Sequence, residues 1–198
     1  MRPMLLLSAV LSLALVSADA AAQQAHSVYL LAGRGGGESG LMEPDYAVDA
    51  GYTREFGDAY GPYVGARYTL GMHRLRANEQ ALLDRYADGT GTVKGGEGTL
   101  YDTGADVEVG YGIGGVRVYG FTGIHYYRQS HEPVTLQSGG REVRVVTGHS
   151  DAFANSRGLG VQLRWNESAS VVAEWYHGGG ADDVMRIDGP RFGARWTF

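Results

Sequence analysis

The chain ends in PRFGARWTF, residues 190–198, a stretch in which apolar and polar residues alternate. In an extended strand, successive side chains point to opposite faces of the sheet. One face here carries Phe192, Ala194, Trp196 and Phe198, and the other carries Arg191, Gly193, Arg195 and Thr197. An apolar strand left as a free edge is an aggregation hazard. We therefore expect this strand to pair with the first strand of the chain and close a barrel.

The N-terminus has the pattern of a secretory signal peptide. Arg2 gives a basic start, an apolar run covers residues 4–16, and small residues follow up to Ala22. Cleavage after Ala20 or Ala22 fits the pattern. The apolar run is shorter than the roughly 20 residues that a membrane-spanning helix needs, and so is every other apolar stretch. We predict a signal peptide over residues 1–22 and one β-barrel domain over residues 23–198, in which any membrane span is a strand.

The composition excludes several classes of protein. Without cysteine the chain has no disulfide and no site for an N-terminal lipid anchor. Residues 23–198 hold 16 basic and 21 acidic residues, so the surface is mildly acidic and nucleic acid is not an expected partner. The 32 glycines and 13 tyrosines are spread through alternating segments without a repeat, a distribution that suits a barrel.

Eight segments alternate between apolar and polar residues. They cover residues 27–34, 45–56, 62–72, 100–111, 116–128, 156–165, 169–177 and 187–198. Most are close to the 9 to 11 residues, roughly, that a tilted strand needs to cross a bilayer. We read them as eight antiparallel strands.

The connections between these segments alternate strictly between short and long. Short ones cover residues 57–61, 112–115 and 166–168, and long ones cover residues 35–44, 73–99, 129–155 and 178–186. In an up-and-down barrel, alternate connections emerge at opposite ends. Outer-membrane barrels have short periplasmic turns and longer extracellular loops. Within the long loops, residues 77–87 are compatible with a short helix or an amphipathic cap, residues 89–98 with a flexible or hairpin tip, and residues 142–147 with an extension of a strand.

The two faces of the strands differ in content. On one side lie apolar residues without a charge, among them Tyr68, Leu70, Val109, Leu159, Val171 and Trp175. The other side holds Asp49, Arg67, Asp106, Glu108, Arg117, Arg164, Glu174 and Arg195 among glycines. A charge on the lipid side costs about 2 to 4 kcal/mol near the bilayer midplane. We therefore expect the apolar side to face lipid and the eight charges to form a network in a lumen filled by side chains.

The alternative architecture is a secreted, soluble lipocalin-like barrel with its apolar side turned inward around a ligand. Its outer face should be broadly polar, with lysines, serines and threonines. The polar side of this chain is instead mostly glycine with a few balanced acids and arginines, and the single lysine, Lys94, lies in a loop. The composition of the faces favours the membrane barrel.

The predicted topology, the loop polarity and the terminal aromatic residue together resemble the small eight-stranded bacterial outer-membrane barrels. These include the opacity proteins and the transmembrane domains of outer membrane proteins A and X. The resemblance implies an all-β transmembrane barrel in the outer membrane and a structural, adhesive or envelope-stabilising role. It also implies that Phe192, Trp196 and Phe198 act as a C-terminal signal for the outer-membrane barrel assembly machinery.

Several partners follow from this interpretation. Outer-membrane lipid and lipopolysaccharide should surround a monomeric barrel. An extracellular partner is expected at loops 73–99 and 129–155, which carry Arg74, Arg76, Arg85, Arg141 and Arg144.

No catalytic or cofactor motif is present in the sequence, so we predict a non-catalytic protein without a cofactor or a metal. His125, His131 and His149 flank one loop and offer a metal site in principle, but independent surface and interfacial histidines explain them better. An enzymatic alternative remains, because some eight-stranded outer-membrane barrels are lipid A deacylases with a histidine and a serine near the end of the seventh strand. This chain has His177 there, but Gly179 stands at the position of the serine nucleophile.

Overall fold

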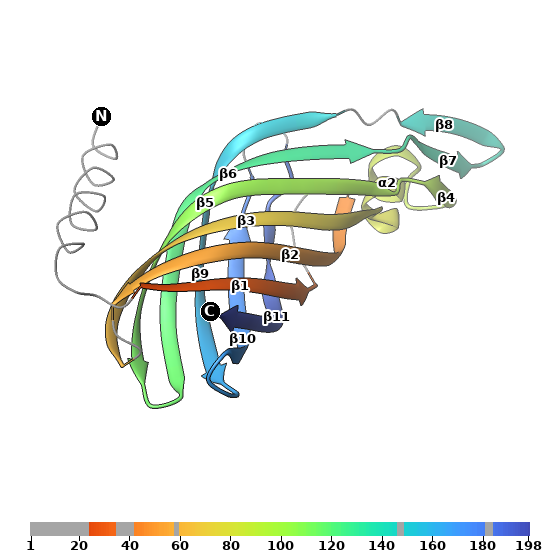
Figure 1. Ribbon diagram of the computed structural model, residues 1–198. Coiled ribbons are helices and arrows are strands. Elements are labelled where there is room, and N and C mark those ends of the chain that lie inside the picture. Colours follow the sequence, from red (N-terminus) through yellow and green to blue (C-terminus); the bar gives the residue numbers. More distant parts are fainter. Residues whose placement is uncertain (1–23, 35–41, 58–59, 146–148, 181–183) are drawn as a thin grey trace.

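The computed structural model describes residues 24–34, 42–57, 60–145, 149–180 and 184–198. The predicted signal peptide, residues 1–22, lies outside them. Eight strands form a closed antiparallel barrel in the order β1-β11-β10-β9-β6-β5-β3-β2 (Figure 1). Their bounds are β1 (Gln24–Gly33), β2 (Met42–Gly57), β3 (Gly61–Ala77), β5 (Gly98–Ile113), β6 (Val116–His131), β9 (Ser150–Arg164), β10 (Ala169–Gly178) and β11 (Ile187–Thr197). The prediction of an all-β, eight-stranded up-and-down barrel is confirmed.

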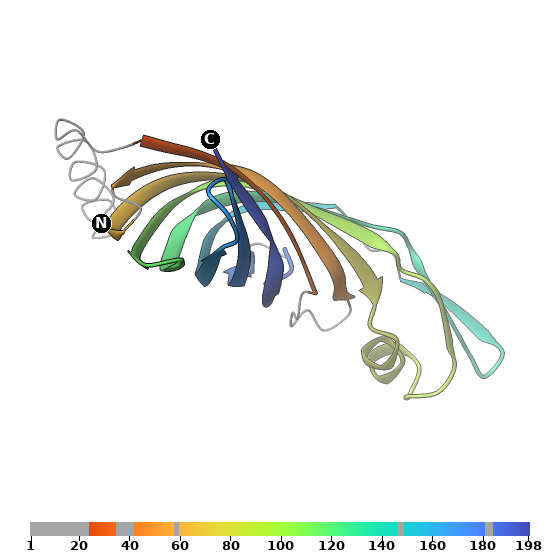
Figure 2. The same ribbon diagram turned by 60° about the horizontal axis from the view of Figure 1, so that its bottom comes forward.

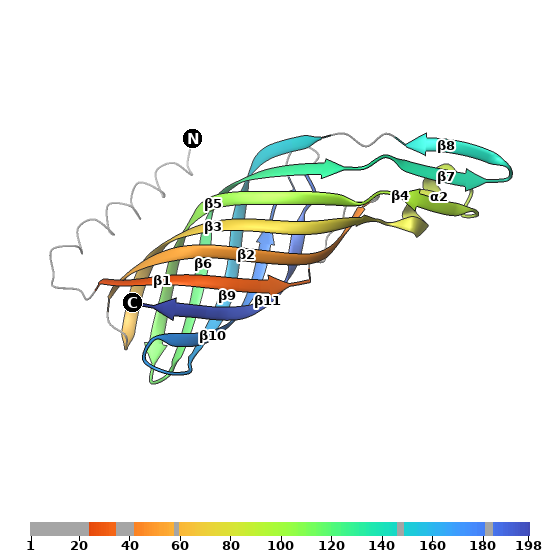
Figure 3. The same ribbon diagram turned by 45° about the vertical axis from the view of Figure 1, so that its right-hand side comes forward.

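The barrel closes where the last strand meets the first. β1 and β11 lie side by side (Figure 3), with Val28 opposite Trp196 and Leu30 opposite Ala194. The contact is close: a Cβ on Gly193 would lie 1.9 Å from the carbonyl oxygen of Leu30, so only glycine fits. The expectation that the C-terminal strand pairs with the first strand is therefore correct.

Side chains alternate across the barrel wall as the sequence predicted. The outer surface carries exposed apolar residues, among them Leu30, Tyr68, Leu70, Val109, Tyr111, Ile124, Leu159, Trp175 and Phe192. The inward side chains of the same strands are buried. This arrangement is the reverse of a lipocalin-like barrel, because the apolar face is outside.

Six strands extend further toward the long-loop end than predicted. β3, for example, continues from the expected end at residue 72 to Ala77, and β9 begins at Ser150 instead of residue 156. The sequence pattern stops where the apolar band stops, but backbone hydrogen bonding continues beyond it.

The two longest loops form a structure of their own, which we call the outer subdomain. It consists of α2 (Glu79–Tyr86), β4 (Thr92–Gly95), β7 (Val134–Ser138) and β8 (Arg141–Val145). The three strands make a sheet in the order β4-β7-β8. Figure 2 shows the yellow-green helix and the teal β7–β8 hairpin beyond the same ends of the barrel strands.

The helix of the outer subdomain has a local cause in the sequence. The side chain of Asn78 caps it by accepting a hydrogen bond from the amide of Ala81 at 3.1 Å. Leu82 on α2 then packs against Val134 and Leu136 of β7. The predicted helix is confirmed. The strand extension expected at residues 142–147 is instead, as far as residue 145, a hairpin partner of β7, and residues 146–147 lie outside the described residues. Among the described residues, no helix is long and apolar enough to cross a membrane.

Candidate functional site

Seven of the eight charged residues expected in the lumen point into the barrel and are mostly or fully buried. They are Asp49, Arg67, Asp106, Glu108, Arg117, Glu174 and Arg195. Arg164 departs from the prediction. It is the last residue of β9, so its exposed side chain lies at the short-turn mouth, with the guanidinium 5.9 Å from the ring centre of Tyr60.

A first cluster fills the lumen near the short-turn end. Arg195 on β11 donates hydrogen bonds to both carboxylate oxygens of Glu108 at 3.0 and 2.9 Å, and to Glu55 at 3.0 Å. Tyr63 donates to Glu108 at 3.0 Å, and Arg117 pairs with Glu55. Such buried carboxylates require their cationic partners, because an unpaired buried charge is strongly unfavourable.

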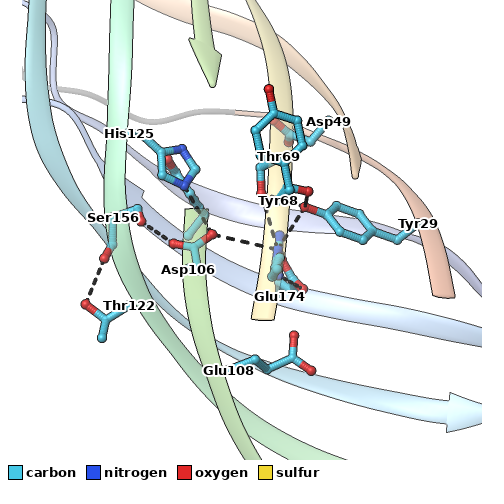
Figure 4. A network of polar contacts seen from close by, with 12 residues as sticks. Tyr29, Asp49, Tyr68, Thr69, Asp106, Glu108, Thr122, His125, Ser156 and Glu174 are labelled. Carbon is cyan, nitrogen blue, oxygen red and sulfur yellow. Dashed lines mark hydrogen bonds and ion pairs between the residues drawn. The ribbon is translucent and has the colours of Figure 1, made fainter. Parts of the chain in front are cut away.

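A second cluster lies further along the lumen. Arg67 on β3 forms two hydrogen bonds with the carboxylate of Glu174 on β10, at 2.6 and 3.1 Å. Tyr119 donates to the same carboxylate at 2.6 Å, and Tyr29 accepts from Arg67 at 2.9 Å. Figure 4 shows Tyr29, Thr69 and Glu174 converging from different strands into the interior. The pair connects strands that are not neighbours in the barrel.

A third cluster, nearer the long-loop end, is built around two histidines. His125 on β6 lies between two aspartates, with Nδ1 3.0 Å from Asp102 and Nε2 3.1 Å from Asp106. Ser156 also donates to Asp106, as Figure 4 shows. Only the protonated ring has two N–H donors, so this geometry fits an imidazolium. The interpretation of His125 as an independent surface or interfacial histidine was therefore wrong, because its side chain is fully buried.

His73, Asp49 and Arg191 complete the third cluster. His73 Nε2 is 3.2 Å from Asp102 Oδ1 and 3.9 Å from Asp49 Oδ1. Arg191 Nη1 is 2.9 Å from Asp49 Oδ2, and its guanidinium lies over the ring of Tyr176, 3.4 Å from the centre.

Several of these interior residues were not predicted as members of the network. They are Glu55, His73, Asp102, His125 and Arg191. Each lies an even number of positions from a predicted lumenal residue on the same strand, and therefore on the same face. Extending the alternation strictly along each strand would have predicted all five. His73 was missed because the apolar pattern ends before it, and the strand does not.

The described lumenal charges comprise six carboxylates, four arginines and two histidines. They are Asp49, Glu55, Asp102, Asp106, Glu108, Glu174, Arg67, Arg117, Arg191, Arg195, His73 and His125. The carboxylates exceed the arginines by two. Additional positive charge in the third cluster, on histidine or from a bound cation, would balance this excess.

Apolar residues cover the third cluster at the long-loop end. Leu31, Met42, Leu75, Leu100, Val184, Met185 and Ile187 are all buried in one hydrophobic cluster. The backbone amide of Met185 donates to Gln129 Oε1 at 2.8 Å, which holds this segment over the lumen. The polar interior is thus separated from the outer subdomain by an apolar layer.

The outer surface has two adjoining hollows near the long-loop end. The first, of about 620 Å³, is lined by Val48, Ala50, Leu70, Met72, Tyr101 and Arg128, among others. The second, of about 420 Å³, shares Met72 and adds polar and charged groups, namely Tyr46, Arg74, Glu97, Thr99, Ser130, His131 and Glu132. An apolar groove thus continues into a polar one that carries both acidic and basic groups.

The five arginines expected in the two longest loops have different surroundings, and Arg74 and Arg76 lie on the extended end of β3 instead of in a loop. Arg74 pairs with Glu97 at 2.7 Å, and Arg76 pairs with Glu43 at 3.2 Å. Arg85 lies over the ring of Tyr86. Arg141 and Arg144 are exposed on β8, at one edge of the outer sheet.

The residues of the expected C-terminal signal lie on the outer surface. Phe192, Trp196 and Phe198 are all exposed. The amide of Phe198 donates to the carbonyl of His26 at 2.9 Å, so the last residue continues the pairing with the first strand.

The enzymatic alternative rests on His177. This histidine contacts Asp188, and Asp188 also pairs with Arg186 at 2.9 Å. Gly179, at the position of the expected nucleophile, has a positive φ of 75° in which a serine would be strained. The dyad of His177 and Asp188 therefore has no serine at the place where the resemblance requires it.

A closed eight-stranded antiparallel barrel with an apolar exterior and a charged interior defines the class of small outer-membrane-type β-barrels. No family model matches the sequence, and no curated protein matches it either. The structure is similar to the outer membrane protein OprG from Pseudomonas aeruginosa, with a TM-score of 0.51 and 11% identity over 89% of this chain and 97% of that chain.

Two further solved structures have the same general architecture. Neisserial surface protein A (NspA) gives a TM-score of 0.48 at 13% identity over 88% of this chain and 99% of that one. Ail, the attachment invasion locus protein of Yersinia pestis, gives 0.45 at 14% identity over 88% and 97%. At these identities, the likeness concerns the fold alone.

Proposed function

We propose that this protein is a non-catalytic barrel of the bacterial outer membrane, which reaches that membrane after signal-peptide cleavage and binds an extracellular partner through its outer subdomain. The observation that carries the proposal is the joining of the two longest loops. β4 from one loop pairs with β7 from the other, and both pack with α2 around Leu82. Simple connections between strands need no core of their own, whereas binding residues are often presented by loops held on a rigid scaffold.

The exposed edge of the outer sheet offers a defined surface for that partner. β8 is an edge strand, and its Arg141 and Arg144 are exposed. Exposed arginines recognise carboxylate, sulfate or phosphate groups through paired N–H donors. An acidic surface on another cell or in the surrounding matrix is therefore the partner chemistry we propose.

The surrounding lipid is the second proposed partner. The apolar groove beside Leu70 and Met72 fits an acyl chain, and Arg74 and Arg128, which line the two hollows, would contact phosphate groups. This distribution suits lipopolysaccharide in the outer leaflet. The protein would act there as a monomer, because closure leaves no free edge in the barrel sheet.

The test replaces the arginines of the outer sheet. We expect Arg141→Glu with Arg144→Glu to reduce binding of whole cells to immobilised heparin and to acidic matrix proteins. Arg164→Glu is the matched control, since Arg164 is an exposed arginine at the opposite end of the barrel. Equal binding by both variants, at equal surface expression, would contradict the proposal.

A further inference from the structure

Three potential metal ligands converge inside the barrel in the third cluster. Asp49 on β2, His73 on β3 and Asp102 on β5 each offer one ligand atom, and these atoms lie within 4.8 Å of one another. All three side chains are fully shielded from solvent. The three strands are neighbours in the barrel, so the site is built from one continuous part of its wall.

The register explains why the two carboxylates meet. Asp49 pairs with Gly71, and Gly71 pairs with Asp102, so the glycine lies between the two aspartates in one row. A Cβ on Gly71 would lie 1.6 Å from Asp102 Oδ1 and 2.5 Å from Asp49 Oδ1. Because Gly71 has no side chain, the Oδ1 atoms of both aspartates can lie close to its backbone. They lie there near His73, the next inward residue of β3.

The carboxylate of Asp49 lacks the donors that a buried carboxylate normally has. Neither of its oxygens accepts a hydrogen bond, although both are buried. Arg191 Nη1 lies 2.9 Å from Oδ2 as an ion pair, but none of its N–H groups is aimed at that oxygen. Oδ1 faces the other two ligand atoms. A buried carboxylate oxygen that accepts no hydrogen bond requires an explanation, and a bound cation would provide one.

The distances indicate which class of ion would fit. His73 Nε2 is 3.2 Å from Asp102 Oδ1 and 3.9 Å from Asp49 Oδ1. Tetrahedral zinc, with bonds of about 2.0 to 2.1 Å, places its ligand atoms roughly 3.3 to 3.5 Å apart. One imidazole nitrogen and two carboxylate oxygens suit zinc or a similar first-row ion, whereas magnesium and calcium prefer oxygen alone.

Both aspartate ligands have outer contacts of the kind that support metal sites, whereas Nδ1 of His73 is buried without a hydrogen-bond partner. His125 Nδ1 is 3.0 Å from the second oxygen of Asp102, and Arg191 lies beside the second oxygen of Asp49. Such outer contacts fix the orientation of metal-ligating groups. Four arginines and the imidazolium of His125 leave one of the six lumenal carboxylates unbalanced, and the positive charge of a bound ion would compensate for it.

We propose that Asp49, His73 and Asp102 bind one divalent cation of the zinc class inside the barrel. The ion would hold β2, β3 and β5 together directly beneath the apolar layer at the long-loop end. Because the site is buried, the ion would enter while the barrel folds. The proposal is independent of the extracellular binding function.

The experiment measures metal in the folded protein. The mature chain is refolded into detergent micelles with Zn²⁺, with Mg²⁺ or with EDTA, then desalted and analysed by mass spectrometry for metal content. Folding is checked separately by the migration of unboiled samples on gels. We expect about one Zn²⁺ and no Mg²⁺ per folded chain. Refolding with Co²⁺ should give the visible absorption bands of a tetrahedral site.

Asp49→Asn and His73→Asn remove one ligand each with little change in size. We expect these variants to bind Zn²⁺ at least about 100-fold more weakly, a larger loss than removal of an outer contact usually causes. His177→Asn is the matched control: it removes a partly exposed histidine outside the lumen and should leave binding unchanged.

Two results would overturn the proposal. One is a folded wild-type chain that retains no more Zn²⁺ than the Asp49→Asn variant, which would assign the compensating positive charge of the cluster to a protonated His73. The other is a loss of Zn²⁺ in His177→Asn, which would place the ion on the outer surface. If neither ligand variant folds, the Co²⁺ spectrum of the wild type decides, and the absence of tetrahedral bands counts against the site.

Discussion

Arg67 and Glu174 form a two-point ion pair across the barrel, between residues that are 107 positions apart in the chain. Their strands, β3 and β10, are separated on one side by β2, β1 and β11. The guanidinium of Arg67 also lies 4.4 Å from the ring centre of Tyr29 and 4.5 Å from that of Phe121. An ion pair in the lumen, enclosed by aromatic rings, thus connects opposite sides of the barrel wall.

Glu174→Gln should destabilise the barrel because it removes the carboxylate paired with buried Arg67 and leaves only the more distant Asp106, at 4.0 Å, as a counter-charge. Removing one partner of a buried ion pair costs about 3 to 5 kcal/mol. We expect a loss of this size in the free energy of unfolding, measured with urea in micelles. Glu97→Gln is the control: it breaks the exposed pair with Arg74, which contributes about 0 to 1 kcal/mol. Similar losses in both variants would show that burial does not determine the strength of these pairs.

Gly193→Ala should impair barrel closure. Its Cβ would lie 1.9 Å from the carbonyl oxygen of Leu30, in the pairing of β1 with β11. We expect less heat-modifiable protein on gels. Gly120→Ala is the control, because its Cβ would meet Leu159 at an ordinary distance of 3.4 Å. Equal folding of the two variants would contradict the importance of this contact.

The fold was predictable from the sequence because the barrel wall has a simple period. Alternation in the last nine residues indicated both the outward face and the closing strand, and the lengths of the loops indicated the topology. The lumen was predictable only in part. Arg164 shares the parity of the interior but lies at the mouth, and no local pattern distinguishes these two positions. The convergence of Asp49, His73 and Asp102 depends on register between strands, which a single sequence does not contain.

The protein should form no stable channel of porin size in planar bilayers. The interior is occupied by buried arginines, tyrosines and carboxylates, and apolar residues such as Leu75 and Met185 cover one end. An eight-stranded barrel is just wide enough for side chains to fill it. A large, persistent conductance would mean that this interior rearranges in the membrane.

Phe198→Ala should reduce the amount of assembled protein in the outer membrane. Phe198 is 75% exposed on the outer surface beside the first strand, where the assembly machinery is proposed to recognise it. Phe153→Ala is a matched control, since Phe153 is also an exposed aromatic residue, 72% accessible on β9. We expect only Phe198→Ala to accumulate unassembled chains, seen by fractionation. Equal accumulation in both variants would indicate a general effect of losing an aromatic residue.

Lipid A should be unchanged in cells that overproduce the protein. His177 has a carboxylate partner in Asp188, as a general base requires, but the position of the expected nucleophile is Gly179, with a backbone conformation that suits glycine. Without a hydroxyl there, the histidine has no group to activate. Mass spectrometry of lipid A checks this, with His177→Ala as the comparison. Loss of an acyl chain in the wild type that His177→Ala restores would establish a deacylase and require a nucleophile elsewhere, whereas identical lipid A in both strains agrees with a non-catalytic barrel.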